Sequence, residues 1–128
     1  EPSLTALAAW CDFLVVITSG GPSTRHLINE TVLNALGPRG FLINVARGTV
    51  VDEAALIRVL QDGRIAGAGL DVFESEPQVP DALTGMDNVV LLPHIASATH
   101  ETRQAMGQRV MDNLEAFERT GQLISAAY

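Results

Sequence analysis

Four short apolar runs dominate the hydrophobic pattern of this chain, and turn-forming residues bound each of them. The runs cover residues 12–18, 40–46, 66–73 and 88–93. Within each run, apolar residues follow one another instead of alternating with polar ones. Strands of this kind are buried on both faces, as in a parallel sheet between two layers of helices. The pattern therefore predicts four parallel strands.

Helix signals lie between the runs. Asn29 can cap a short helix that ends at Gly37 and Pro38, and Asp52 can cap a second helix that ends near Gly63. The residues expected to face the core are Val32, Leu33, Leu36, Leu56, Val59 and Leu60. The alternation of strands and helices predicts an α/β fold, a Rossmann-like parallel sheet with flanking helices.

A third, longer helix is predicted from about Thr99 to just before Gly121. Its apolar stripe consists of Met106, Val110, Leu114 and Phe117. We interpret this stripe as a packing surface rather than as a groove for a partner. The segment 74–88 contains prolines and is expected to form one long loop.

Composition narrows the classes of function. The chain has 128 residues, 47% of them hydrophobic, and a net charge of −7. It can bury a core, and the scattered basic residues argue against a nucleic-acid partner. Cys11 is the single cysteine, so an internal disulfide is impossible and a cytoplasmic location is expected. The apolar runs are far shorter than the roughly 18 residues of a membrane helix, so no membrane partner is expected either.

Polar side chains gather where the predicted strands end. Arg47 follows the second run, Asp71 lies near the end of the third with Glu74 and Glu76 beyond it, and His94 follows the fourth. Because ligands of open parallel sheets bind outside the carboxyl ends of the strands, these residues are candidates for an active site. Each also has a plainer interpretation, as a solvated loop charge or a structural histidine.

The residue types suit a reaction of small 2-oxo or 2-hydroxy acids. An arginine can bind a carboxylate through two hydrogen bonds, and a histidine can exchange a proton near neutral pH. A neighbouring carboxylate would orient the imidazole and stabilise its charged form. No side chain can supply a hydride, so the chemistry also requires a nicotinamide cofactor, NAD(P)(H). No metal site is expected.

Three segments carry a family resemblance. The stretches "NVARGTVVDEAAL", "GAGLDVFESEP" and "LPHIASATHETR" closely resemble the three successive signatures of the D-isomer-specific 2-hydroxyacid dehydrogenases, and "TRHLIN" resembles the segment after that family's fourth Rossmann strand. The last signature looks most like the branch of glyoxylate, hydroxypyruvate and 2-ketogluconate reductases. The resemblance implies an NAD(P)-dependent oxidoreductase that acts on a small 2-oxo acid.

The resemblance also implies roles for particular residues. The family pattern makes Arg47 the substrate-binding arginine, Glu76 the partner of the histidine, and His94 the acid or base. The cofactor-binding residues that it implies are Thr18, Ser19, Val45, Ala46, Arg47, Asp71, His94, Ala96 and Ser97. Where many relatives have Leu-His-x-Pro-Leu-Thr, this chain has "VITSGGPS", so Thr18 and Ser19 would contact the cofactor mainly through their backbone.

The resemblance covers nearly all of this chain but less than half of a family member. No strand is followed by the glycine motif G-x-G-x-x-G that binds a pyrophosphate, and the family's N-terminal substrate domain has no counterpart. Residues 1–98 are therefore expected to be the C-terminal part of the NAD(P)-binding domain. Residues 99–128 would be the helix and tail that return to the substrate domain. A homodimer is expected because family members commonly pair through this domain.

Two other functions remain open from the sequence. The corepressors called C-terminal-binding proteins keep the same signatures, so a non-catalytic dinucleotide-sensing module is one alternative. The other is a folding unit with no activity of its own, since much of the cofactor's binding energy comes from the missing pyrophosphate loop. We expect the isolated chain to be inactive even if the longer protein is an enzyme.

Overall fold

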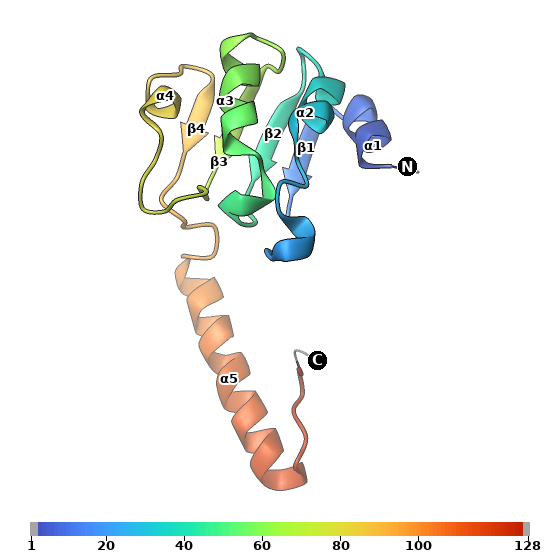
Figure 1. Ribbon diagram of the computed structural model, residues 1–128. Coiled ribbons are helices and arrows are strands. Elements are labelled where there is room, and N and C mark those ends of the chain that lie inside the picture. The colour runs from blue at the N-terminus through green and yellow to red at the C-terminus, as the bar shows by residue number, and fades with distance from the viewer. Residues whose placement is uncertain (1–2, 127–128) are drawn as a thin grey trace. The chain divides into compact units, whose positions relative to one another are not determined.

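The computed structural model describes residues 3–126, which form two compact units, 3–94 and 95–126. The four predicted strands are confirmed as β1 (Phe13–Val16), β2 (Phe41–Asn44), β3 (Gly67–Leu70) and β4 (Val89–Leu91). They pair in parallel in the order β1-β2-β3-β4 (Figure 1). The expected α/β fold with a parallel sheet is therefore correct, and the carboxyl ends of all four strands share one edge.

Two helices between the strands begin at the predicted caps. In α2 (Glu30–Leu36), the Asn29 side chain accepts hydrogen bonds from the Thr31 and Val32 amides. In α3 (Glu53–Gln61), Asp52 Oδ1 accepts one from the Ala55 amide at 3.0 Å. Each cap satisfies amides that the first helical turn leaves without a partner. The six apolar residues predicted to face the core are all buried.

The structure adds short elements that the hydrophobic pattern did not predict. Helix α1 (Leu4–Trp10) packs against α2 near the start of the first unit. The segment 74–88, expected to be a loop throughout, contains the single-turn helix α4 (Asp81–Thr84) next to β4. Two 3₁₀ turns, η1 (Pro22–Thr24) and η2 (Gly48–Val50), follow β1 and β2. Elements of three or four residues carry too few apolar positions to show a helical period, and α1 buries only Ala8 of its seven residues.

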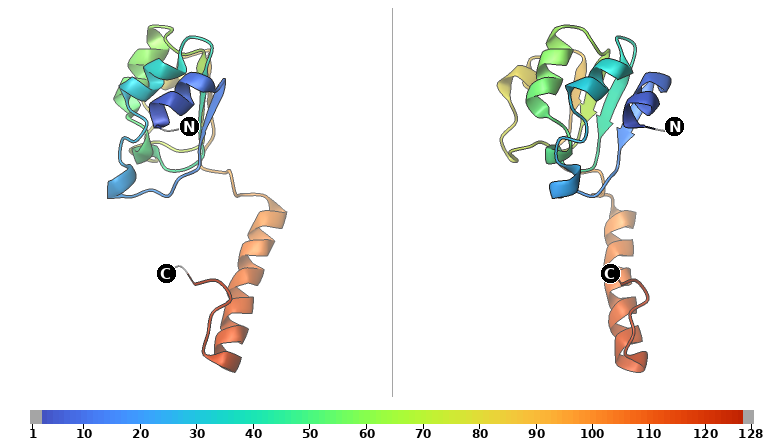
Figure 2. Two further views of the ribbon diagram at one scale, coloured as in Figure 1. Left: turned by 90° about the vertical axis from the view of Figure 1, so that its right-hand side faces the viewer. Right: turned by 45° about the vertical axis from the view of Figure 1, so that its right-hand side comes forward.

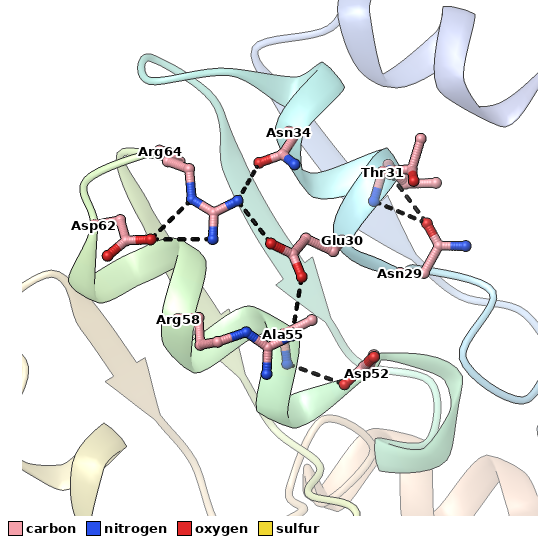
Figure 3. Close-up of polar contacts among 10 residues, drawn as sticks. Asn29, Glu30, Thr31, Asn34, Asp52, Ala55, Arg58, Asp62 and Arg64 are labelled. Carbon is pink, nitrogen blue, oxygen red and sulfur yellow. Dashed lines mark hydrogen bonds and ion pairs between the residues drawn. The ribbon is translucent and has the colours of Figure 1, made fainter.

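An exposed ionic network joins α2 to α3 (Figure 3). Glu30 accepts hydrogen bonds from Arg58 and Arg64, both at 2.9 Å, and Arg64 also donates to Asn34 at 2.7 Å. Asp62 completes the network through its own pair with Arg64. The bond from Arg58, followed by that from Arg64, lowers the pKa of Glu30. The network therefore fixes two helices that lie on the same face of the sheet.

The expectation that both faces of every strand are buried is wrong. Helices α2 and α3 cover one face (Figures 1 and 2), where Leu14, Val16 and Leu42 are buried. The side chains of β1 and β4 that point to the opposite face are exposed, because α2 and α3 do not lie over that face. The exposed side chains include Phe13 and Val15 on β1 and Val90 on β4, at 60%, 53% and 64%.

The second unit is built on one long helix, α5 (His100–Thr120), which matches the predicted third helix. Thr99 caps its first turn by accepting the Thr102 amide at 3.1 Å, and Gly121 ends it in the left-handed conformation. The tail then turns back, and Asn113 exchanges hydrogen bonds with Ser125. The predicted apolar stripe is half exposed along its whole length, at Met106, Val110, Leu114 and Phe117.

Candidate active site

The turn after β2 explains how an arginine comes to follow a core strand. Asn44, only 1% exposed, is the last residue of β2. Its amide group donates to the Arg47 carbonyl at 3.2 Å, and its Oδ1 accepts the Ala46 amide at 3.1 Å. The buried Asn44 side chain thus closes the turn, and both its amide nitrogen and its amide oxygen have hydrogen-bond partners. The result is an exposed Arg47 at the carboxyl edge of the sheet.

Gly48 lets this turn approach the end of β3. A Cβ atom at position 48 would lie 1.9 Å from the carbonyl carbon and oxygen of Phe73. The end of a flexible side chain could move away from an added methyl group, but these backbone atoms cannot. Only glycine therefore fits at position 48. The close approach brings the Arg47 turn next to the segment that carries Glu74 and Glu76.

His94 and Glu76 form a direct pair. His94 Nδ1 lies 2.8 Å from Glu76 Oε2, and the other carboxylate oxygen, Oε1, accepts the Phe73 amide at 3.0 Å. The bond to His94, followed by that from Phe73, lowers the pKa of Glu76, and the charge of Arg47 contributes in the same direction. An ionised carboxylate can only accept, so His94 Nδ1 carries the hydrogen and Nε2 is left for another partner.

The backbone of His94 is unusual. Its φ of 56° places a non-glycine residue in the left-handed region. Such a conformation costs on the order of 1–3 kcal/mol and persists only where the surroundings impose it. The bond to Glu76 is the contact that holds the ring of His94.

The structure also separates Glu74 from Glu76, between which the family resemblance, and not the spacing, selected Glu76. Glu74 Oε1 pairs with Arg25 at 2.7 Å and with His26 Nε2 at 3.0 Å, whereas Glu76 pairs with His94. The Glu74 amide in turn donates to Glu53 at 3.2 Å. Burial is the main cause that raises the pKa of Glu53. Glu74 therefore ties two loops together, and Glu76 is the carboxylate beside the imidazole.

One cleft of about 520 Å³ brings the three predicted catalytic residues together. Arg47, Glu76 and His94 all line it, along with glycines of two turns. The cleft lining is completed by Gly20, Gly21, Gly48, Thr49, Phe73, Glu74 and Ser75. A smaller, mainly apolar pocket of about 330 Å³ shares Phe73, Glu76 and His94 with it. A cation, an imidazole and a carboxylate around one opening suit the binding and protonation of a small anion.

The predicted cofactor-binding residues of the first unit also lie at the carboxyl edge. Asp71 directly follows β3 and is 2% exposed, and its amide donates to the Asn44 carbonyl at 3.0 Å. Thr18 and Ser19 follow β1 and are exposed, while Val45 and Ala46 follow β2. Ala96 and Ser97 belong to the second unit, so their part in this site stays a prediction.

Several residues of the site were not predicted. Gly20, Arg25 and His26 act through contacts with segments far away in the sequence, whereas the Asn44 side chain bonds within its own turn. A polar residue inside the apolar run "FLINVA" was a signal for Asn44. Among residues 3–126, no cluster of His, Cys, Asp and Glu is arranged to hold a metal ion. The helices of that range are also too short or too polar to cross a membrane.

The first 96 residues of the chain match a known protein family. Residues 1–96 match the family model described as "D-isomer specific 2-hydroxyacid dehydrogenase, NAD binding domain". The chain is 56% identical over 117 residues to a 2-ketogluconate reductase of Gluconobacter oxydans, covering 91% of this chain and 38% of that protein. It is 52% identical over 115 residues to a glyoxylate/hydroxypyruvate reductase of Arabidopsis thaliana, covering 90% of this chain and 37% of that protein.

A solved structure shows the same fold. The NADPH-dependent glyoxylate/hydroxypyruvate reductase of Sinorhizobium meliloti, crystallised with NADP and malonate, superposes with a TM-score of 0.92 at 55% identity. The match covers 99% of this chain and 40% of that one. The chain thus spans about two fifths of the length of the relatives that it resembles.

Proposed function

Because this chain belongs to the D-isomer-specific 2-hydroxyacid dehydrogenase family, we propose that it is the C-terminal part of an NAD(P)H-dependent reductase. The proposed substrate is a small 2-oxo acid of the glyoxylate or hydroxypyruvate type. The observation that carries the proposal is the cleft in which Arg47, Glu76 and His94 meet. The reductase names of the relatives favour this activity over a corepressor-like sensing module.

His94 is proposed to donate the proton during reduction. Glu76 fixes Nδ1 at 2.8 Å, which leaves Nε2 as the nitrogen for the substrate. As negative charge develops on the carbonyl oxygen, a proton from Nε2 neutralises it. The ionised Glu76 stabilises the imidazolium before transfer, and in the reverse direction the neutral ring accepts the proton. The same pair of residues, His94 and Glu76, therefore serves both the reduction and the reverse oxidation.

Arg47 is proposed to bind the substrate carboxylate. Its planar guanidinium can donate two parallel hydrogen bonds to one carboxylate and stays charged at every working pH. In the structure, Nη1 donates to the Ala46 carbonyl at 2.6 Å, which holds the group against its own turn. Binding the carboxylate there would place the adjacent carbonyl within reach of both Arg47 and His94, which line the same cleft.

The edge residues fit the nicotinamide end of NAD(P)H. A buried carboxylate at Asp71 suits the amide hydrogens of a carboxamide, and the exposed residues Thr18 and Ser19 after β1 offer further polar groups. The residues proposed to hold the cofactor are Thr18, Ser19, Val45, Ala46, Arg47, Asp71, His94, Ala96 and Ser97. When bound, the cofactor supplies the hydride that reduces C2 of the acid.

A substrate panel tests this proposal. A full-length reductase that carries this chain should oxidise NADH or NADPH with glyoxylate and hydroxypyruvate. Glycolaldehyde, which has a carbonyl but no carboxylate, should be a far poorer substrate because it cannot use Arg47. Absence of cofactor oxidation with both acids would contradict the proposed substrates. Equal rates with glycolaldehyde would contradict the role of Arg47.

Four finer expectations belong to the same proposal. The isolated 128-residue chain should be inactive with the same acids, the complete protein should be a homodimer, and it should reside in the cytoplasm. Residues 99–128 should form the return to a substrate domain. Light scattering after size exclusion of the complete protein tests the dimer, and a monomeric mass would contradict it.

A further inference from the structure

Gly20 lies against the stem of Arg47. A Cβ atom at position 20 would sit 2.6 Å from Arg47 Cγ, 3.1 Å from its Cβ and 3.8 Å from its Cδ. Both residues line the same cleft. The loop after β1 therefore runs directly along the side chain that is proposed to bind substrate, and it does so at a position without a side chain of its own.

Hydrogen bonds fix both the Arg47 turn and the loop that precedes Gly20. The backbone of the Arg47 turn is held by the buried Asn44, and the guanidinium is held by the Ala46 carbonyl at 2.6 Å. On the other side, the Thr24 hydroxyl donates to the Ser19 carbonyl at 2.8 Å, which fixes the loop just before Gly20. An added methyl group would meet Cγ, whose position is set by the first side-chain torsion. The side chain of Arg47 would have to rotate.

The backbone alone gives no reason for glycine at this position. The glycines with positive φ are Gly21, Gly37, Gly63 and Gly121. Gly20 is not among them, so an alanine could adopt its backbone conformation without strain. The space taken by the Arg47 stem is what excludes a side chain at position 20.

We propose that Gly20 is a positioning residue for Arg47. By leaving room for the stem, it sets the direction in which the guanidinium enters the cleft, and hence the fit to a substrate carboxylate. The inference rests on the proposed function for its effect on catalysis. The contact itself is independent of which acid is reduced.

The test compares Gly20→Ala with Gly85→Ala in a full-length reductase that carries this chain. Gly85 is exposed, and a Cβ there would have no neighbour closer than 4.0 Å. Because misplacing a binding group by about 1 Å can cost about 100-fold, Gly20→Ala should raise KM for glyoxylate at least about tenfold. KM for the cofactor should rise less than KM for glyoxylate, and Gly85→Ala should alter neither constant.

A double-mutant cycle ties the effect to Arg47. An Arg47→Ala background removes Cγ at 2.6 Å and keeps only Cβ at 3.1 Å, so adding Gly20→Ala should change kcat/KM and the thermal midpoint much less than it does in the wild type. If Gly20→Ala alone folds poorly, Arg47→Ala should restore its midpoint to that of the Arg47→Ala single variant. Equal losses in both backgrounds, or an unchanged KM for glyoxylate, would overturn the inference.

The cycle also separates this inference from the proposed function. If the wild-type protein reduces no 2-oxo acid, the proposed function fails, while the thermal midpoints still report the contact between Gly20 and Arg47. If the wild-type protein is active and Arg47→Ala impairs it, but Gly20→Ala does not, the positioning role alone fails.

Discussion

At the scale of single residues, the site depends on a close approach of two backbones. Gly48 is buried, and a Cβ atom there would lie 1.9 Å from Phe73 backbone atoms. We expect Gly48→Ala to lower the free energy of unfolding by at least about 2 kcal/mol, because neither turn can move without breaking core contacts. Chemical denaturation measures this loss. Gly85→Ala is the matched control, and equal midpoints for the two variants would contradict the close approach.

Glu76 should give the site a defined dependence on pH. Its pKa in the folded chain is lowered by the bond to His94. A carboxyl group with a lowered pKa stabilises the fold above its unfolded pKa, near 4.5, and loses that contribution as the pH falls through the folded value.

The stability difference between wild type and Glu76→Gln should therefore be constant at neutral pH and shrink as the pH falls below 4.5. Because Glu76 is partly exposed, we expect a modest difference that is best followed as thermal midpoints. Glu53→Gln, which removes a carboxylate whose pKa is raised, should not reproduce that pattern. A difference that grows toward low pH would contradict the pair.

Sequence reasoning worked best for residues that follow strands. Arg47, Glu76 and His94 could be placed at one edge because parallel strands end together. The role of Gly20 could not be predicted, because it arises from a contact across folded loops that no local pattern contains. The Asn44 side chain bonds within its own turn, and its only signal was a polar residue inside an apolar run. Which turn lies beside Gly20 is settled only when the sheet forms.

At the scale of elements, the caps determine where helices begin. Asn29, Asp52 and Thr99 were predicted as caps or starting points, and all three side chains accept an amide hydrogen bond. Helix α4 was missed because four residues give little periodicity, whereas α1, although as long as α2, buries only Ala8 and so shows no distinct apolar face. Cap chemistry is local and readable in a sequence, whereas short helices depend on what they pack against.

Asp52 provides the prediction at this scale. Asp52→Ala should lower the free energy of unfolding by about 1 kcal/mol, because the first turn of α3 loses the acceptor for the Ala55 amide. Thermal unfolding measures the change. The exposed Asp87 gives a control with the same change of charge, and Asp87→Ala should be nearly neutral. Equal effects of the two substitutions would show that charge, and not the cap, matters.

At the scale of the whole molecule, one sheet face is apolar and exposed. Register places Val15, Ile43, Gly69 and Val90 in one row across the four strands. Phe13 and Phe41 stack beside this row with ring centroids 5.2 Å apart. Parallel sheets are ordinarily covered on both faces, which is why the sequence predicted full burial. That prediction failed because a continuous apolar run shows that both faces of a strand can be buried, but it does not show which elements lie over each face.

The isolated 128-residue chain should therefore self-associate. Exposed apolar surface on Val15 and Val90, at 53% and 64%, favours contact between copies. Sedimentation velocity should show a concentration-dependent rise in mass, and the double variant Val15→Lys with Val90→Lys should reduce it. Arg39→Lys, at an exposed site elsewhere, serves as a control. Association that persists unchanged in the double variant would mean that this face is not responsible.

His94 is proposed to exchange the proton of a 2-oxo acid reduction while Glu76 holds its ring. The most direct measurement is kcat for glyoxylate in a full-length reductase that carries His94→Asn, with His100→Asn at an exposed histidine as the matched control. We predict that His94→Asn lowers kcat by about 100-fold or more, because loss of a general acid or base typically costs that much, while His100→Asn stays near wild type. Undiminished turnover in His94→Asn would contradict the claim.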